Sequence, residues 1–397
     1  MKTNSFEGSA DILVLSASDQ VARTSLGTNS RVQVVTKIFR CLLIVGVWNA
    51  PGLAADPTKP DQALEARIQA VIPDVERYIT SGMKVFDVPG LAIGIVANDK
   101  LVYGKGFGVR AKEGGGAVDT RTVFQIGSTT KGFLATTLAM MVDRGPLKWD
   151  ERVVDLYPDF QFKDPWVTRE FRVFDLIAQR SGLPPYANDM LGMIGVGETE
   201  MIRSLRYVEP VSSFRSTFAY TNITHLLAGR IVAKAAGAVD WNTFLRQELL
   251  EPLGMKDSSY AAAIAAASNH AEGYRWTPEG TVAVPFTQLF PYDFGGAGAI
   301  NSTVEDTAHW VRFQLSNGTF EGRRLVSSEN LAKTRTPEVA LNDKGFYAMG
   351  WAVQQTPKGN VIWHNGADHE LRRIYWFRSG NRGRRYGPHE RNERRFS

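Results

Sequence analysis

Two side chains near residue 130 have the types and the spacing of a nucleophile and its base. Ser128 and Lys131 lie three residues apart in the segment FQIGSTTKGFLATTLAMMVDRGP, which runs from Phe124 to Pro146. A helix would place both on one face, with the serine oxygen beside free backbone N–H groups and the lysine within reach of it. Burial at the edge of a core lowers the pKa of a lysine, so its neutral form can accept the serine proton. The spacing therefore predicts a nucleophilic serine.

The residues after Ser128 predict the buried helix that this chemistry requires. Apolar side chains recur at intervals of three and four residues, and Gly145 followed by Pro146 marks the end of the helix. A second Ser-x-x-Lys, at Ser81 and Lys84, ends a polar helix, and no apolar helix follows it to hold its lysine inside. We therefore assign the nucleophile to Ser128. Its alternative role is a helix N-cap beside a solvated lysine.

A second short segment carries side chains suited to the same reaction. Tyr220 and Asn222 lie in a polar turn before an apolar helix, where a phenol can relay protons and an amide can hold an acyl group. Tyr186 and Asn188 repeat the pattern after the SGLPP loop. The turn followed by a helix favours Tyr220, whose alternative role is to cap that helix.

A third segment, the strand-like NVIWHNGAD, could bind a substrate at its end. Glycine at Gly366 would let a substrate backbone approach the strand edge, and His364 before it could touch the ligand. The N–H of Ala367 could point into an oxyanion hole. Taken alone, a histidine at a strand end is more often structural than catalytic.

Together and in this order, the three segments resemble the active-site motifs of serine β-lactamases and penicillin-binding proteins. That family shows Ser-x-x-Lys, then Tyr- or Ser-x-Asn, then Lys-Thr-Gly or a His-x-Gly variant. The surrounding phrases IGSTTKGF, RSGLPPY, FAYTN, GGAGAINSTVEDTA and HNGAD are similar to the branch of class C β-lactamases, D-aminopeptidases and family VIII carboxylesterases. The resemblance covers roughly residues 62–377.

The resemblance implies acyl transfer followed by hydrolysis, with no metal and no cofactor. Ser128 would be the acylated nucleophile, and Lys131 and Tyr220 would share the general-base and proton-relay work. Asn222 would orient the substrate. The N–H groups of Ser128 and Ala367 would bind the oxyanion.

Two residues near the third motif depart from the family pattern. His364 stands where β-lactamases and transpeptidases generally carry lysine, and a histidine is mostly neutral at pH 7. A permanent cation would suit the carboxylate of penicillins and D-alanyl peptides. Glu370 would repel anionic substrates further, unless it is a solvated loop charge. These departures favour an esterase or amidase.

Other functions stay open at this stage. A β-lactamase or D-Ala-D-Ala carboxypeptidase is one alternative, and a non-catalytic penicillin-binding sensor or an inactive truncated remnant is another. A Ser-His-Asp hydrolase of a different fold is disfavoured, because the chain has no G-x-S-x-G.

The order of the expected elements indicates an α/β (α+β) fold of the β-lactamase and transpeptidase type. A helix and a hairpin precede the Ser128 helix, further helices fill the middle, and strands return at YAMGWAVQQ, NVIWHNG and ELRRIYWF. Strands at both ends predict one antiparallel sheet with an inserted all-helical domain. We expect the sheet domain at 56–126 and 335–377 and the helical domain at 127–334.

The N-terminal residues predict export. A basic stretch precedes the apolar segment CLLIVGVW and the small residues of PGLAAD, a pattern typical of a signal cut after Ala54 or Ala55. The apolar segment is too short to span a bilayer, so we expect a periplasmic or secreted protein with no stable membrane anchor. Residues 1–55 would then be an N-terminal extension and signal peptide. Residues 1–31 are polar and aperiodic, and our hypothesis is a start codon placed too early.

The C-terminal residues predict a disordered basic tail. Residues 378–397 contain no Leu, Ile, Val or Met, so they can supply neither a buried strand nor an amphipathic helix. In the family that the chain resembles, a further strand and a C-terminal helix follow at this point. Their absence predicts a gap inside the sheet and a marginally stable protein, and suggests a shifted reading frame or a truncated gene.

The composition is that of an ordinary soluble globular protein: 397 residues, 43% hydrophobic and 22% charged. The net charge of +5 equals that of residues 378–397, with seven Arg and two Glu, so the rest of the chain is neutral and no nucleic-acid partner is indicated. The single cysteine, Cys41, lies inside the expected signal. We expect a small-molecule ester, amide or β-lactam as the partner. The sequence does not indicate an oligomeric state.

Overall fold

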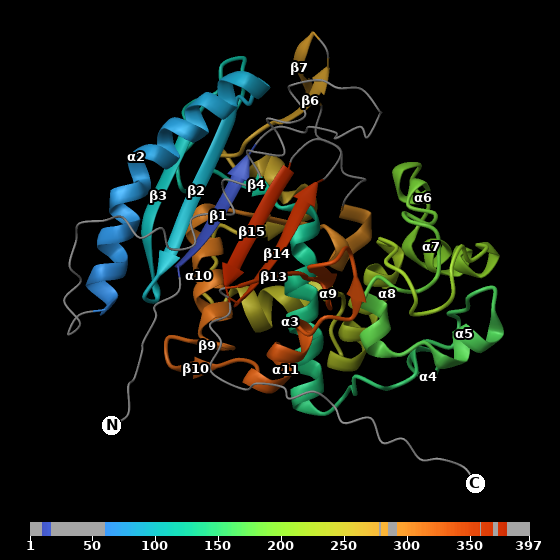
Figure 1. Cartoon of the computed structure of the whole chain (residues 1–397). Helices are drawn as coiled ribbons and strands as arrows, with labels where there is room; N and C mark the ends of the chain where they lie inside the picture. The colour runs from blue at the N-terminus through green and yellow to red at the C-terminus, as the bar shows by residue number, and fades with distance from the viewer. Residues whose placement is uncertain are drawn as a thin grey trace, which may run out of the picture.

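An antiparallel sheet is the frame of the molecule (Figure 1). The computed structural model describes residues 10–16, 60–277, 279–284, 292–357, 359–367 and 372–378. The sheet strands are β1 (Ala10–Ser16), β2 (Gly90–Ala97), β3 (Lys100–Gly108), β11 (Val339–Ala340), β12 (Gly345–Tyr347), β13 (Ala352–Thr356), β14 (Gly359–Ala367) and β15 (Arg372–Arg378). Their order is β11-β12-β13-β14-β15-β1-β2-β3, and every neighbouring pair is antiparallel. The predicted fold class is confirmed.

Strand β1 shows that the predicted gap in the sheet was wrong. β1 pairs with β15 on one side and β2 on the other, so that Val14 lies opposite both Ile374 and Ile93. Figure 1 shows β1 between β15 and β2, where the gap was expected. The prediction failed because residues 1–31 are polar as a whole, whereas their segment ADILVLS is an apolar run of strand length.

Because β1 pairs on both sides, neither β15 nor β2 has the open edge from which marginal stability was predicted. The expected signal cleavage site, Cys41, Glu370 and residues 379–397 lie outside the described residues.

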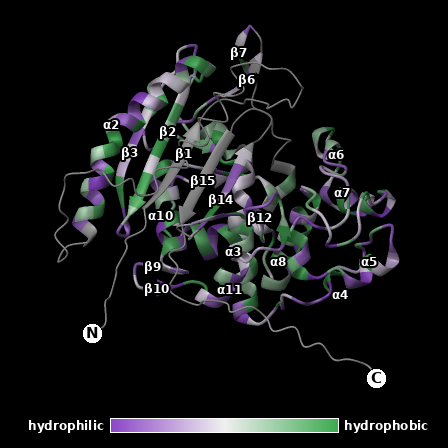
Figure 2. Ribbon diagram, viewed as in Figure 1, coloured by the Kyte–Doolittle hydropathy of each residue, from purple (hydrophilic) through white to green (hydrophobic). Residues whose placement is uncertain are grey.

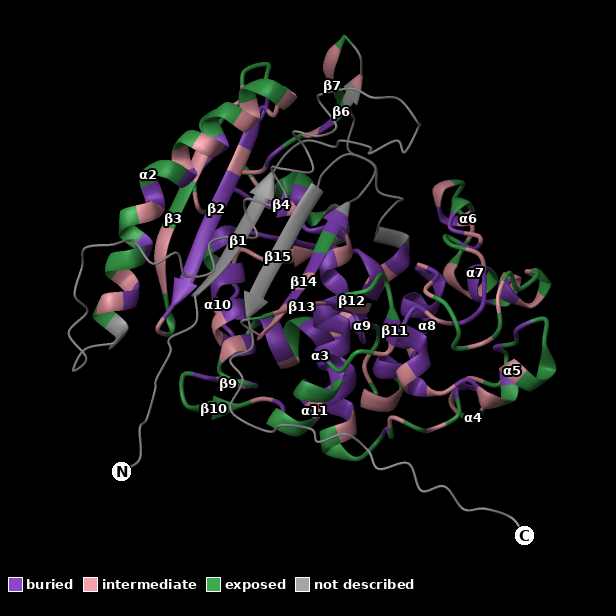
Figure 3. Cartoon of the chain, viewed as in Figure 1, coloured by how far each residue is buried: buried purple, intermediate pink, exposed green. Residues whose placement is uncertain are grey.

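Helix α2 (Pro60–Phe86) covers the outer face of the sheet at β2 and β3. Its buried apolar residues recur at intervals of three and four and pack on both strands. They are Leu64, Ile68, Ile72, Val75 and Ile79. Along α2, the colours for hydropathy and burial alternate in Figures 2 and 3. Asn98 and Asp99, both with positive φ, form the two-residue turn of the β2–β3 hairpin. The predicted helix and hairpin are confirmed.

The inner face of the sheet packs on α10 (Val304–Leu315), behind which lies α3 (Thr130–Arg144). Helix α3 is buried along most of its length and ends at Gly145 in the left-handed conformation, as predicted. Phe133 of α3 stacks on Trp310 of α10 with ring centroids 3.9 Å apart. A Cβ at Gly132 would lie 2.5 Å from the Trp351 ring, so only glycine lets α3 approach the β12–β13 connection this closely. These contacts fix α3 against the sheet.

The middle of the chain contains the expected helices, but it is not all-helical. The helices are α4 (Val153–Leu156), α5 (Pro165–Glu170), α6 (Met190–Met193), α7 (Glu198–Ser204), α8 (Ile223–Ala236), α9 (Trp241–Leu245) and α11 (Ser328–Thr334). Short strands accompany them: β4 (Phe124–Gln125), β5 (Ser259–Tyr260), β6 (Gly273–Thr277), β7 (Gly280–Val284), β8 (Ile300–Ser302), β9 (Thr319–Phe320) and β10 (Arg323–Arg324). The prediction missed them because segments of two to five residues carry too little periodicity. Within the described part of the chain, no helix combines the length and hydropathy needed to cross a membrane.

Candidate active site

The predicted nucleophile lies in a 3-10 turn, Gly127–Thr129, directly before α3. Lys131 follows in the first turn of α3, with its Nζ 3.1 Å from the Ser128 Oγ. Ser128 is partly exposed, whereas Lys131 is completely buried. The buried helix α3 thus holds the amine inside the core, as the sequence predicted, while the Ser128 hydroxyl lies at the edge of the core.

Burial changes the acid–base behaviour of Lys131. Desolvation lowers its pKa to about 7, and the charge of Asp189 opposes this shift. Its Nζ also lies 2.8 Å from Oδ1 of Asn222 and 2.7 Å from the carbonyl oxygen of Ala297. Near neutral pH a substantial fraction of the amine is unprotonated and can accept a proton. Ala297 belongs to the phrase GGAGAINSTVEDTA, to which sequence analysis gave no role in the site.

Tyr220 lies over the same lysine, with its ring centroid 4.7 Å from Lys131 Nζ, and its phenol hydrogen bonds with Ser128. Burial raises the Tyr220 pKa well above its usual value, so the phenol is neutral at pH 7. The alternative Tyr186 packs beside Tyr220 but is 61% exposed, and Asn188 points to Ser204. Tyr220, and not Tyr186, therefore lies beside Ser128 in the structure.

Asn222 occupies the N-cap position of α8, but its side chain does not cap that helix. Its Nδ2 donates to Oδ2 of Asp189 at 2.6 Å, while its Oδ1 faces Lys131. Asp189 is 7% exposed, and desolvation raises its pKa to about 6 against the opposing effects of Asn222 and Lys131. Sequence analysis missed Asp189, whose only trace was a single carboxylate in the apolar segment PPYANDMLGMIG.

His364 on β14 is buried and neutral. Its Nδ1 donates to the carbonyl oxygen of Asn365 at 2.6 Å, so its Nε2 accepts a hydrogen bond from the Tyr347 phenol at 2.9 Å. Desolvation, aided by the charge of Lys131, lowers the His364 pKa to about 3. Both ring nitrogens are occupied, and the side chain carries no charge at neutral pH. Tyr347 was not foreseen from the sequence.

Gly366 lets β14 pass close to the nucleophile. A Cβ at this position would lie 2.1 Å from the carbonyl oxygen of Ile126 and 3.3 Å from the backbone nitrogen of Ser128. Any other residue would push the strand away from the serine turn. Ala367 follows at the end of β14, where it pairs with Arg372. Its place in an oxyanion hole stays a prediction.

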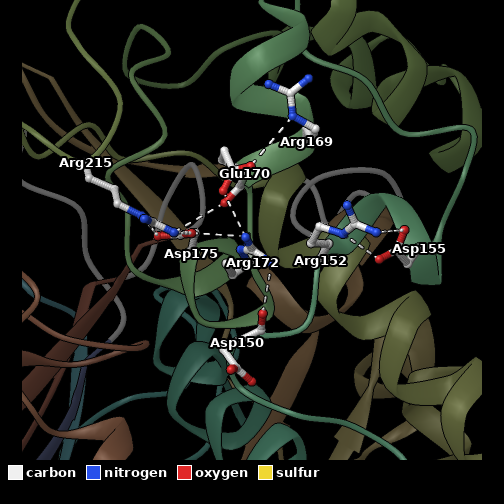
Figure 4. A network of polar contacts seen from close by, with 8 residues as sticks. All are labelled: Asp150, Arg152, Asp155, Arg169, Glu170, Arg172, Asp175 and Arg215. Carbon is white, nitrogen blue, oxygen red and sulfur yellow. Dashed lines mark hydrogen bonds and ion pairs between the residues drawn. The ribbon is translucent and has the colours of Figure 1, made fainter.

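A buried carboxylate holds the segment that leads to Tyr220. Asp175 accepts two hydrogen bonds from the guanidinium of Arg215, at 3.0 and 2.6 Å (Figure 4). Further along, the Ala219 nitrogen donates to the carbonyl oxygen of Gln179 at 2.8 Å. The phenol is therefore positioned by a fixed backbone. No group of acidic, histidine or cysteine side chains in the described part of the chain could hold a metal ion.

The site residues all lie in a part of the chain that matches one known protein family. A family model described as Beta-lactamase matches residues 75–382, a range that contains every site residue named above. The chain belongs to the beta-lactamase family. Members of this family are serine hydrolases, which is the chemistry that the three segments suggested.

Relatives extend the comparison across bacteria, fungi and archaea. Penicillin-binding protein 4 of Amycolatopsis lactamdurans is 29% identical over 66% of this chain and 70% of its own length. Two proteins named unguisins hydrolase, from Aspergillus violaceofuscus and Aspergillus campestris, are 28% and 26% identical over 60% and 74% of this chain. The chain spans only 44% and 57% of those two fungal proteins.

A solved structure shows the same fold. The octameric penicillin-binding protein homologue from Pyrococcus abyssi superimposes with a TM-score of 0.66 at 24% identity, over 78% of this chain and 73% of the archaeal one. This protein therefore shares the fold of the archaeal penicillin-binding protein homologue.

Proposed function

We propose that the protein is a serine hydrolase that forms an acyl-enzyme on Ser128 and acts as an esterase or amidase. The observation that carries this proposal is the buried Lys131, whose Nζ lies 3.1 Å from the serine oxygen and whose pKa is about 7. A solvated lysine would be protonated at pH 7 and could not serve as a base.

The reaction proceeds in two steps. Lys131 takes the hydroxyl proton of Ser128 while the serine oxygen attacks the substrate carbonyl, and the proton then passes through the Tyr220 phenol to the leaving group. Water next attacks the acyl-enzyme and releases the acid. The neutral phenol suits a relay, because it can accept one proton while giving up another. The Ser128 and Ala367 N–H groups would stabilise the negative oxygen.

Labelling tests the proposal directly. A fluorophosphonate probe should add one covalent group to the wild-type protein, detected as an intact-mass increase, and Ser128→Ala should abolish it. Ser81→Ala, the matched control on exposed α2, should label like wild type. Labelling that survives Ser128→Ala but disappears with Ser81→Ala would move the active site elsewhere. Labelling of neither variant nor wild type would favour an inactive remnant, and a stable penicillin adduct without turnover would favour a sensor.

The environment of His364 sets the expected substrate class. Both nitrogens of this buried, neutral imidazole form hydrogen bonds, with Tyr347 and Asn365, so it offers no cation to a substrate carboxylate. A short-chain phenyl ester should therefore have a higher kcat/KM than a penicillin. A higher kcat/KM for the penicillin would favour the second candidate, a β-lactamase or D-Ala-D-Ala carboxypeptidase. The similarity to penicillin-binding protein 4 supports this candidate. His364→Lys should lower KM for substrates that carry a carboxylate.

The proposal also includes export to the periplasm or the medium, and this part rests on the sequence alone. Cleavage after Ala54 or Ala55 would detach β1 from α2, so a processed chain would hold this strand without a covalent link or would lack it. Intact-mass analysis of the purified protein distinguishes a chain cut at Ala54 from one that keeps Ala10–Ser16.

A further inference from the structure

The hydrogen bonds around Lys131 determine which way its lone pair points. A neutral amine has two N–H bonds and one lone pair, and Lys131 Nζ has three polar neighbours at hydrogen-bond distance among the described residues: Ser128 Oγ, Asn222 Oδ1 and the Ala297 oxygen. A backbone carbonyl can only accept, so one N–H must go to Ala297. The hydroxyl of Ser128 can donate or accept. The direction of the lone pair therefore depends on Asn222.

An asparagine side chain can present either its oxygen or its NH2 group to a neighbour. At Asn222 the choice is made by Asp189, whose Oδ2 lies 2.6 Å from the amide nitrogen. An ionised carboxylate can only accept, so the NH2 group must face Asp189 and the oxygen must face the lysine. The second N–H of Lys131 then goes to Asn222, and only the lone pair remains for Ser128.

We propose that Asp189 is a positioning residue for acylation, which fixes the amide of Asn222 and so directs the lone pair of Lys131 at the hydroxyl of Ser128. The proposal rests on the hydrolase function proposed above. Asp189 does not touch the reacting atoms. Its charge raises the Lys131 pKa directly, but it sets the direction of the lone pair only through Asn222.

The surroundings of Asp189 and Asn222 favour this role over a purely structural one. Each stands at the N-cap position of a helix, α6 and α8, yet neither side chain caps its helix. Oδ1 of Asp189 is buried and has no hydrogen-bond partner among the described residues. A buried carboxylate with one unsatisfied oxygen destabilises a fold. Neither side chain therefore stabilises its own helix: Asp189 is directed to Asn222, and Asn222 is directed to Lys131.

A double-mutant cycle tests the route of the effect. Asp189→Ala should slow labelling by fluorophosphonate about ten- to a hundredfold, because the Asn222 amide can then turn, and Asp189→Asn, which retains an acceptor, should recover part of the loss. In an Asn222→Ala background, Asp189→Ala should change the rate less than about twofold. The control Asn188→Ala, in the same loop but bonded to Ser204, should label like wild type. The proposal would be overturned if Asp189→Ala slowed labelling by the same factor with and without Asn222→Ala. It would also be overturned if Asp189→Ala alone did not slow labelling.

A second measurement decides the matter without turnover. In Ser128→Ala protein labelled with 15N-asparagine, one side-chain amide proton should be shifted downfield and exchange slowly, and Asn222→Ala should identify it by its loss. Asp189→Ala should remove that shift and protection, with Asn188→Ala as the control. An Asn222 amide that is unprotected, or that does not respond to Asp189→Ala, overturns the positioning role. If the wild-type protein does not label, the proposed hydrolase function is wrong. The amide measurement still tests the positioning role of Asp189 in that case.

Discussion

The chain carries Ser-x-x-Lys twice, on two helices that differ in what surrounds them. On α2, Ser81 and Lys84 are both exposed near the end of a helix that covers the outside of the sheet. At the start of α3, the same spacing puts Lys131 inside the core, with Ser128 at its edge. The difference teaches that spacing brings two groups within reach, whereas burial lowers the pKa of the lysine so that its amine can accept a proton near pH 7.

The largest expected effect comes from removing the buried amine. Lys131→Ala should slow acylation by a short-chain phenyl ester about a thousandfold, because nucleophile and base act as a unit. Lys84→Ala should leave the rate unchanged. Stopped-flow measurement of the acylation burst gives both rates, and a loss of less than about tenfold in Lys131→Ala would argue against a base at this position.

The pH dependence of acylation should report the buried lysine. The rate should rise about tenfold per pH unit in acid and level off with a midpoint near 7, as Lys131 loses its proton. Asp189→Asn should move the midpoint to lower pH, because the carboxylate charge raises the Lys131 pKa. A midpoint near the ordinary lysine value of about 10.4 would contradict this assignment. Lys84→Ala serves as the control with an unchanged profile.

The smallest effect concerns stability. A pKa of about 7 in the folded state, against about 10.4 in the unfolded chain, means that burying Lys131 costs about 4 kcal/mol at pH 7. Lys131→Met should therefore raise the free energy of unfolding, by about 1 to 2 kcal/mol once the unsatisfied oxygens of Asn222 and Ala297 are allowed for. The gain should shrink as pH rises toward 10, where the unfolded chain also loses the proton.

Denaturant unfolding at pH 7 and pH 10 measures this gain, with Lys84→Met as the exposed control that should change stability by less than about 0.5 kcal/mol. A Lys131→Met protein that is less stable than wild type at pH 7 would mean that the lysine contributes to the fold rather than straining it.

Sequence patterns predicted the parts of the site that lie on strongly periodic elements. Helix α3 and its Gly145 terminus, the β2–β3 hairpin and strand β14 follow from local spacing, so Ser128, Lys131 and His364 could be placed in advance. Choosing Tyr220 over Tyr186 needed only the turn before α8. In each case the decisive information lies within about ten residues of the side chain.

Contacts between distant segments could not be predicted in this way. Asp189 meets Asn222 across 33 residues, and Tyr347 on β12 meets His364 on β14 across 17 residues, with β13 between the two strands. The carbonyl of Ala297 has no side-chain signature at all. Strand β1 was missed for a related reason, because its partners β2 and β15 lie far away in sequence and its own seven residues are surrounded by polar ones.

The position of β1 also orders the events of synthesis. Strand Ala10–Ser16 can pair with β2 once Gly90–Ala97 has been made, but its other neighbour, Arg372–Arg378, is made more than 350 residues after it. During that interval the nascent β1–β2–β3 ribbon keeps one bare edge of backbone N–H and C=O groups. Completion of the sheet is consequently a high-contact-order step that waits for the synthesis of Arg372–Arg378, and until then the unpaired edge of β1 can bind a wrong partner.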